Sequence, residues 1–499
     1  MMKMVKNVLL AVLIMLGSSM ISSESMARDT LRLNMNELLE LAGSESPDLM
    51  IARIRHSNSF WQYQSFLADL RPQIELGANL PVLNRAIEPI VLPDGSEDFR
   101  SRSLMSNSLN VSLSQIIPST GGQVFLSTGL RRIDLFSGDG ITGSTSWLSS
   151  PVSLGINQPL FRFNQFKWNR IIEPLRMEES ELAFSEELES IYRRAVGLFF
   201  DVITAQLDLE AARLDAENAD TLYQLSLGRY DLGRIAETDL LQMELNLRNA
   251  EAQIARSTIS LDIAMERLRD FLGIESEVYF HFELPDELPE MEVDPGFALD
   301  HARSHRSQII SFQRRLLESQ SQLERAERNS GIDIQISGSI GFSQTADNFA
   351  DAYRNLIDQE QVSVGISLPI ADWGKTRARK EIARSQLELT ERTIRQEEVN
   401  FERDILITVQ QFHQVRQQVS LSKQAMDITN QRLDITRNRY LIGKIGTLDL
   451  NLAITERESA RRAYISALRS YWQTHFDLRG LTLYDFENRR SLVRDLDGF

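Results

Sequence analysis

The chain has 499 residues, no cysteine and a formal net charge of −16, with 42% hydrophobic and 25% charged residues. The lack of cysteine excludes disulfides, thiolate metal sites, cysteine nucleophiles and a lipid anchor on an N-terminal cysteine. The acidic balance makes nucleic acid a poor partner, because phosphates repel an acidic surface.

The first 27 residues are predicted to be an export signal peptide. Lys3 and Lys6 give a basic start, residues 8–16 form a short apolar core, and small residues precede a cleavage site after Ala27. The apolar core is too short for a membrane anchor, which needs about 20 residues. No later segment approaches 18 consecutive apolar residues. A membrane-spanning form of this chain would therefore be a β-barrel.

Two blocks of the mature chain repeat at one offset. Residues 152–160 match 362–370, and an Arg-Tyr-x-x-Gly motif followed by Asp-Leu at 229–240 recurs at 439–450. Both matches have an offset of 210 residues, which is hard to obtain by chance. The sequence therefore predicts two internal structural repeats.

The first repeat carries an insertion. Upstream of the matched blocks the offset is 260 rather than 210, so 50 extra residues lie between Leu76 and Val152. Apolar and polar residues alternate on both sides of a Pro-Ser-Thr-Gly-Gly turn at 118–122. We expect this insertion to add two strands, giving the first repeat four strands and the second repeat two.

Each repeat is expected to contain a short helix, strands, a very long helix, a glycine turn and a returning helix. The short helices are predicted at about 47–70 and 297–328, the strands at about 72–160 and 332–370, the long helices at about 164–228 and 375–441, and the returning helices at about 236–271 and 447–478. The predicted organisation is a signal peptide at 1–27, a first repeat at 28–273, an acidic proline-containing linker at 274–296, a second repeat at 297–480 and a polar tail at 481–499.

The predicted strands alternate apolar residues with small polar ones, so each has one apolar and one polar face. A soluble sheet with one wet face and a membrane barrel with a polar lumen both fit this pattern. The export signal and a group of aromatic residues just beyond the strands favour the barrel, because aromatic rings collect at membrane interfaces. These aromatic residues are Phe161, Phe163, Phe166, Trp168 and Trp373.

The long helices carry narrow apolar stripes in steps of four and three, which is the heptad pattern of coiled coils. Residues 376–442 contain neither glycine nor proline and would run about 100 Å as one helix. Many stripe positions are Ala, Ser or Thr, which suits a thin wall with water on two sides better than a thick core.

The repeats, the strand exit Leu-Pro-Ile-Ala-Asp-Trp-Gly at 368–374 and the two glycine turns together resemble the TolC-like outer-membrane efflux protein family. The resemblance covers nearly the whole mature chain. It implies an α+β membrane protein, in which a trimeric outer-membrane β-barrel continues into a long α-helical coiled-coil barrel in the periplasm. It also implies a homotrimer in outer-membrane lipid, a periplasmic adaptor (membrane fusion) protein and an inner-membrane transporter as partners. The implied function is a channel for efflux or type I secretion.

By this resemblance, the glycine turns lie at the periplasmic tip, where the tunnel opens and closes. Tyr440, Thr238 and Asp239 fall at positions that latch the closed state. The family's latch arginine corresponds to Ile445, and one of its two acidic rings corresponds to Leu452, so this sequence departs from the family's pattern at both positions. The candidate gating residues are Tyr440, Asp239, Thr238, Asp449, Gly233, Gly443, Lys444 and Arg234. Alternatively, the glycines only form turns and the aspartates only cap helices.

No catalytic set and no cofactor site emerge from the sequence. His301 and His305 are spaced for a metal on one helix face, but no third ligand accompanies them, so a solvated pair is the expectation. The alternative from another class is a periplasmic coiled-coil scaffold or adaptor. Such a protein would account for the helices and the export signal but not for the repeated strands.

Overall fold

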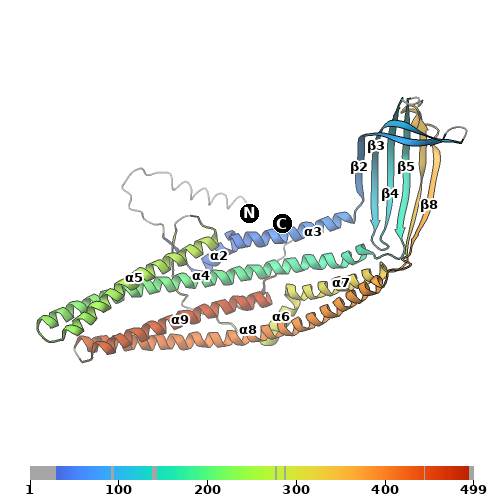
Figure 1. Cartoon of the computed structure of the whole chain (residues 1–499). Coiled ribbons are helices and arrows are strands. Elements are labelled where there is room, and N and C mark those ends of the chain that lie inside the picture. Colours follow the sequence, from blue (N-terminus) through green and yellow to red (C-terminus); the bar gives the residue numbers. More distant parts are fainter. Residues whose placement is uncertain are drawn as a thin grey trace. The chain divides into compact units, whose positions relative to one another are not determined.

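The computed structural model describes residues 30–91, 95–137, 143–275, 278–285, 288–442 and 444–493 (Figure 1). The predicted signal peptide lies outside these residues. The chain divides into two compact units. One lies within Met1–Pro47 and Ala195–Leu288, and the other within Asp48–Arg194 and Pro289–Phe499.

The first unit is built around a small parallel strand pair. Strand β1 (Thr30–Leu33) pairs with β6 (Tyr279–Phe282), which lies in the segment that the sequence assigns to a linker. The unit also contains α2 (Met35–Glu45), the second part of α4 (Gln165–Asp231) and α5 (Glu237–Leu272). Its core is a cluster of aromatic rings, all less than 9% exposed: Phe199, Phe200, Phe280 and Phe282.

The second unit contains one six-stranded antiparallel sheet, whose strands lie side by side in Figure 1. The strands are β2 (Gln73–Val91), β3 (Glu97–Ile117), β4 (Gly122–Phe136), β5 (Ser144–Pro159), β7 (Asp333–Ala346) and β8 (Ile357–Ser367). They follow one another in the order β2-β3-β4-β5-β7-β8. The prediction that the insertion supplies two strands is confirmed, because β3 and β4 occupy it.

The helices of the second unit run in long antiparallel pairs. They are α3 (Pro47–Asp69), the first part of α4, α6 (Pro295–His305), α7 (Ser307–Arg328), α8 (Lys375–Leu441) and α9 (Thr447–Thr482). Helix α8 contacts both α9 and α7. It has the predicted bounds, and its 67 residues give a length of about 100 Å. No helix in the described ranges combines the length and the apolar character of a membrane span.

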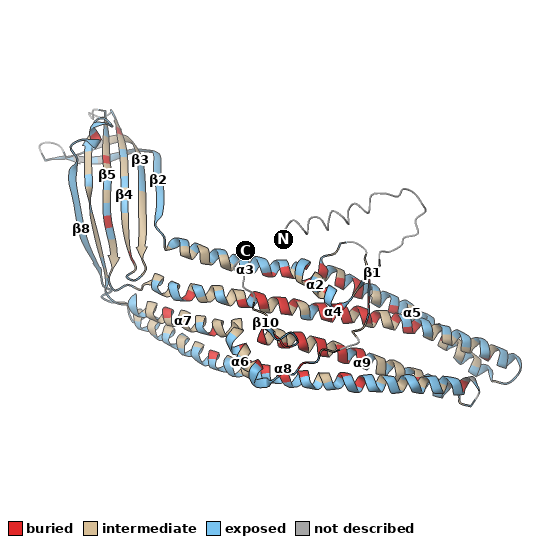
Figure 2. Ribbon diagram, turned by 180° about the vertical axis from the view of Figure 1, so that it is seen from behind, coloured by how far each residue is buried: buried red, intermediate tan, exposed pale blue. Residues whose placement is uncertain are grey.

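The predicted heptad rows form the packed faces of the long helices, seen as stripes of buried residues in Figure 2. In α4, Leu188, Ile191 and Val202 are at most 3% exposed. In α8, Ile405 and Phe412 are completely buried. The coiled-coil interpretation of these rows is therefore confirmed.

Three sequence expectations need correction in the second unit. The helix expected over 297–328 is two helices, because Arg306 adopts an extended backbone and its guanidinium donates to the carbonyl of Gly480 at 2.7 Å. The last helix, expected over about 447–478, extends to Thr482 and is followed by Leu483 in the left-handed region with φ 47°. The polar tail is partly packed, since Leu483, Asp485 and Phe486 are buried.

Candidate functional site

The sheet has two chemically different faces. Directly opposed residues in a strand pair lie on the same face, so the register assigns every side chain to a face. The outer face carries apolar side chains that are 38–80% exposed: Ile74, Leu76, Leu109, Val111, Leu126, Val152, Leu154, Ile156, Ile340, Phe342, Val362, Val364 and Ile366. The inner face carries small or polar residues: Glu75, Gly77, Asn110, Ser112, Ser127, Ser153, Gly155, Ser337, Ser339, Ser363 and Gly365.

An apolar surface of this extent is much larger than the isolated apolar residues of a soluble surface. Aromatic rings lie beyond both of its ends. At one end Phe161 is 51% exposed and Trp373 is 98% exposed. At the other end Trp147 packs edge-on against Phe349, and the guanidinium of Arg132 lies 5.4 Å from the Trp147 ring centre. Two aromatic girdles around an apolar band are typical of a sheet that crosses a membrane.

Two of the predicted girdle residues have another role. The indole Nε1 of Trp168 donates to the carboxylate of Glu324 on α7 at 2.6 Å. The ring of Phe163 lies 4.8 Å beneath the guanidinium of Arg325, also on α7. These two rings therefore attach the start of α4 to α7, a role that alternation in the sequence could not reveal.

The sheet ends in two open edges. Within the described residues, β2 pairs only with β3, and β8 pairs only with β7. All eleven residues of β8 are exposed. Open edges carry a row of unpaired backbone donors and acceptors, which hydrocarbon does not tolerate.

The first tip turn joins α4 to α5. Gly233 has φ 65°, and its N–H and that of Arg234 each donate at 2.8 Å to carbonyls of the last turn of α4. Asp239 is the third residue of α5 rather than its N-cap, which is Ala236. The carboxylate of Asp239 accepts from the Ala236 N–H at 3.4 Å, so it completes the cap from inside the helix. Thr238 and Arg234 are exposed.

The second tip turn joins α8 to α9, and Gly443 within it lies outside the described residues. Tyr440 is 7% exposed, whereas Tyr230, its counterpart in the first repeat, is 39% exposed. Lys444 donates its N–H to a carbonyl of α8 at 2.9 Å and has an exposed side chain. Asp449 is exposed and is the third residue of α9, so like Asp239 it is not the N-cap.

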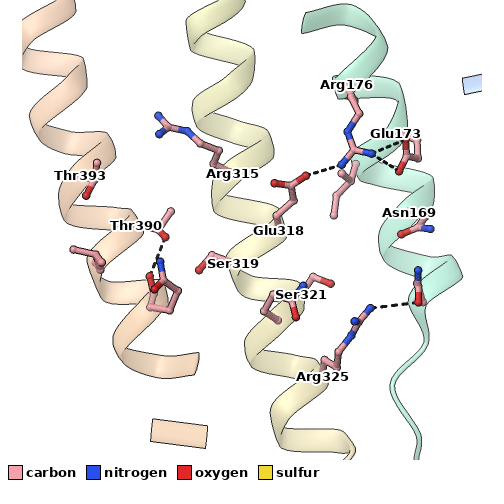
Figure 3. Close-up of a pocket in the computed structure, with 15 residues that line it drawn as sticks. Asn169, Glu173, Arg176, Arg315, Glu318, Ser319, Ser321, Arg325, Thr390 and Thr393 are labelled. Atoms are coloured by element: carbon pink, nitrogen blue, oxygen red, sulfur yellow. Dashed lines mark hydrogen bonds and ion pairs between the residues drawn. The ribbon is translucent and has the colours of Figure 1, made fainter. Parts of the chain in front are cut away.

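A polar cavity of about 720 Å³ lies between α4, α7 and α8 (Figure 3). Arg176 bridges Glu173 at 3.0 Å and Glu318 at 2.8 Å across it. Arg314 and Glu179 extend the same network at the cavity's margin. Arg325, which also lines the cavity, donates to the side-chain oxygen of Gln165 at 3.3 Å and lies over the Phe163 ring. The lining is therefore a network of polar side chains joined by hydrogen bonds and ion pairs. No group of three or more candidate metal ligands occurs in the described part of the chain.

A buried ionic cluster ties α9 to α4. Both carboxylate oxygens of Glu189 accept from Arg479, at 2.8 and 3.0 Å, and Arg479 lies 3.5 Å from the carboxylate of Asp485. Glu189 and Asp485 are almost fully buried. Next to them, His475 is 2% exposed between the rings of Trp472 and Phe476. The sequence analysis missed this cluster, because its members are far apart along the chain.

Burial lowers the pKa of His475 to about 3. The positive charge of Arg479 acts in the same direction, whereas the negative charge of Asp485 raises this pKa. An unfolded chain would bind a proton at this histidine near pH 6.5, whereas the folded chain would not. The contribution of His475 to the free energy of unfolding is therefore fully present above pH 6.5 and is lost as the pH drops toward 3. We expect a loss of roughly 2 kcal/mol at pH 5 from this group alone.

The pH dependence can be measured as the thermal unfolding midpoint of the purified protein at pH 7.5, 6 and 5. His475→Phe should flatten the decrease on acidification, because a phenyl ring binds no proton. His281→Phe, at an exposed position of β6, serves as the control and should keep the decrease of the unchanged chain. An equally steep decrease in His475→Phe would contradict the assignment.

His301 and His305 are not the solvated pair that the sequence suggests. Their rings stack with centres 4.4 Å apart, and the His301 ring lies 4.6 Å from that of Tyr484. Burial and the neighbouring His305 lower the pKa of His301. The ring of His301 therefore packs α6 against the C-terminal strands.

The chain matches a family model described as outer membrane efflux protein over residues 118–274 and 299–482, which is more than half of its length. Among curated proteins, it is 20% identical over 241 residues to the alkaline protease secretion protein AprF of Pseudomonas aeruginosa. That match covers 47% of this chain and 49% of AprF, so it spans about half the length of the curated relative.

Solved outer-membrane channels have the same fold. The CmeC channel of Campylobacter jejuni is 15% identical, with a TM-score of 0.64 over 90% of this chain and 85% of that one. The open state of the MtrE channel of Neisseria gonorrhoeae is 16% identical, with a TM-score of 0.58 over 90% and 88%. A membrane protein from Pseudomonas aeruginosa is 15% identical, with a TM-score of 0.65 over 95% and 97%.

Proposed function

The chain belongs to the outer membrane efflux protein family, and on that premise we propose that three copies form a passive export duct through the outer membrane. The observation that carries the proposal is the sheet with an apolar outer face, a polar inner face and two open edges. A sheet in hydrocarbon must close on itself, and six strands with two free edges require further copies to do so. The duct would carry small molecules or proteins and needs no cofactor.

The alternative, a periplasmic scaffold or adaptor, leaves the apolar outer face of the sheet without an explanation. Extraction distinguishes the two. A scaffold leaves the cell envelope with salt, whereas the proposed channel should require detergent and purify as a homotrimer. A monodisperse monomer in mild detergent, with its β-structure intact, would contradict the proposal.

Some apolar rows on the helices are exposed in a single chain, and this exposure supports helix contacts with other chains. On α8, Leu421, Ile428 and Ile435 recur at intervals of seven and are 53–64% exposed. On α5, Ile259 and Ile263 are also exposed. Rows with this spacing fit coiled-coil contacts with other copies and with helices of a periplasmic adaptor. Crosslinking in intact envelopes followed by co-purification should recover that adaptor together with an inner-membrane transporter.

We also propose that the tip turns gate the duct, with Tyr440, Thr238 and Asp239 holding it closed in the assembled trimer. The burial of Tyr440 beside a helix-reversing turn supports this role. Asp449, Lys444 and Arg234 supply charge on the turns. Gly233, with φ 65°, allows the first reversal, and the internal repeat predicts the same role for Gly443. One hydrogen bond contributes about 1 kcal/mol, and threefold symmetry multiplies it, so a partner protein could release the closed state.

Tyr440→Phe combined with Asp239→Ala should therefore raise the single-channel conductance in planar bilayers several-fold. Both substitutions remove a polar group of the proposed latch and leave the helices intact. Tyr230→Phe, at the equivalent and more exposed position, is the matched control and should conduct like the unchanged protein. If the folded, trimeric double variant conducts like the control, the turns are only structural.

A further inference from the structure

We propose that the β3–β4 hairpin sets the width of the duct in the outer membrane, so that three copies enclose an open aqueous lumen within eighteen strands. The inference rests on the proposed trimer. Barrels of 16–18 strands leave an aqueous channel, whereas the interior of an eight-stranded barrel is filled by side chains.

The hairpin is part of the sheet rather than an appendage. In the strand order, β3 and β4 lie between β2 and β5. Residue pairing with β2 runs along β3 from Ser114 to Glu97, and pairing with β5 runs along β4 from Gln123 to Leu135. Within the described residues, β2 and β5 do not pair with each other. The hairpin cannot leave the sheet unless both ladders break.

The two-faced pattern continues through the hairpin without a change of phase. On the outer face, Leu113 lies between Ile74 of β2 and Leu126 of β4. On the inner face, one row crosses four strands: Glu75, Ser112, Ser127 and Ser153. A hairpin that lies outside the membrane would not be expected to carry an apolar face aligned with the apolar outer face of the neighbouring strands.

The lower turn of the hairpin is bonded to the base of the sheet. The amide of Asn164 donates to the carbonyl of Pro118 at 2.8 Å, and the hydroxyl of Thr120 donates to the Gln158 amide oxygen at 2.8 Å. These bonds connect the turn to the end of β5 and to the residue that precedes α4. The hairpin therefore begins at the same level as its neighbours.

The inner face leaves space. From Ser106 to Ser114 on β3, from Gln123 to Arg131 on β4 and from Ser153 to Asn157 on β5, the inner-face residues other than Phe125 are small or polar. Larger apolar residues lie on this face only nearer the strand ends: Leu104, Ile116, Ile133, Leu135 and Leu148. A Cβ atom added to Gly155 would come within 2.3 Å of the Phe125 ring, so the far end of this ring occupies the space beside the glycine. Barrel diameter grows about linearly with strand number, so losing the hairpin from each copy, eighteen strands to twelve, narrows the barrel by about one third.

The width can be measured with a single reporter thiol, because the chain has no cysteine. Ser337→Cys places the thiol on the inner face of β7, and maleimide-polyethylene glycols of graded size are added outside intact cells. Deletion of residues 97–143 joins β2 to β5 and preserves their antiparallel direction. We expect the largest polymer that labels this deletion to be about one third smaller in diameter than for the full chain.

A matched control removes extracellular mass without removing strands from the membrane. Replacing residues 84–103 by a two-residue turn shortens the upper part of β2 and β3 but keeps all six strands. The Ser337→Cys thiol in this variant should react with polymers at least as large as those that react with it in the full chain. An equal size limit in the full chain and in the trimeric deletion would overturn the proposal.

A second measurement does not depend on folding of the deletion. In otherwise full-length trimers, Glu75→Cys with Ser112→Cys and Ser127→Cys with Ser153→Cys should form disulfides, because each pair is directly opposed. Glu75→Cys with Ser153→Cys should not. The reverse result would place β2 beside β5 and exclude the hairpin from the barrel. A complex that is not a trimer would instead contradict the proposed assembly.

Discussion

Replacing Val111 by arginine should destabilise the membrane-embedded sheet by about 2–4 kcal/mol, the cost of a charge facing lipid near the bilayer midplane. Val111 lies on the outer face of β3, in the middle of its apolar row, and is opposed by Leu76 and Thr128. No neighbour there can pair with a guanidinium. The fraction of protein that reaches the outer membrane as detergent-stable trimer should fall sharply, which gel electrophoresis without heating can measure.

The adjacent residue is the matched control. Ser112 faces the proposed lumen, where it is opposed by Glu75 and Ser127. Ser112→Arg should leave trimer assembly near that of the unchanged chain, because water and the Glu75 carboxylate can accommodate the new charge. Equal losses in both variants would mean that neither face of the sheet contacts lipid.

Replacing Arg479 by methionine should cost about 3–5 kcal/mol, the typical result of removing one partner from a buried ion pair. Methionine keeps most of the length of the side chain but removes the guanidinium that neutralises Glu189 and Asp485. These carboxylates lie where α4, α9 and the C-terminal strands meet. The loss should appear as a lower thermal unfolding midpoint, with increased protease cleavage near the C-terminus.

Arg384→Met provides the comparison for this variant. Arg384 pairs with Glu381 at 3.2 Å on α8, and both side chains are more than half exposed. Exposed pairs of this kind contribute at most about 1 kcal/mol. If the two variants unfold at the same temperature, the cluster around Arg479 does not stabilise the fold in the way its burial suggests.

The elements that were predicted correctly are those whose pattern is local. The heptads of α8 and the alternation in β7 repeat at every turn or residue pair, so a single sequence contains them many times over. The insertion was recognised because a change of repeat offset coincided with the same alternation. Asp239 and Asp449 lie beside the two turns, each as the third residue of its helix and not as the N-cap, and their gating role stays a prediction.

The features that were missed depend on partners distant in sequence. The break between α6 and α7 at Arg306 follows from a hydrogen bond to Gly480, 174 residues away. The packing of the C-terminal segment follows from the buried Asp485 and its contact with Arg479. Likewise, nothing local distinguishes the buried Tyr440 from the exposed Tyr230. Local periodicity carries no information about such contacts.

The join between β5 and β7 has a consequence for the order of folding. Strands β2 to β5 are consecutive hairpins and can pair as soon as they emerge, but β5 must wait for β7, whose residues lie more than 170 positions later. Until then the β5 edge is a template for aggregation. We therefore expect assembly to depend on periplasmic chaperones that protect this edge. In their absence, aggregates should protect the backbone amides of β5 from hydrogen exchange while those of β8 still exchange.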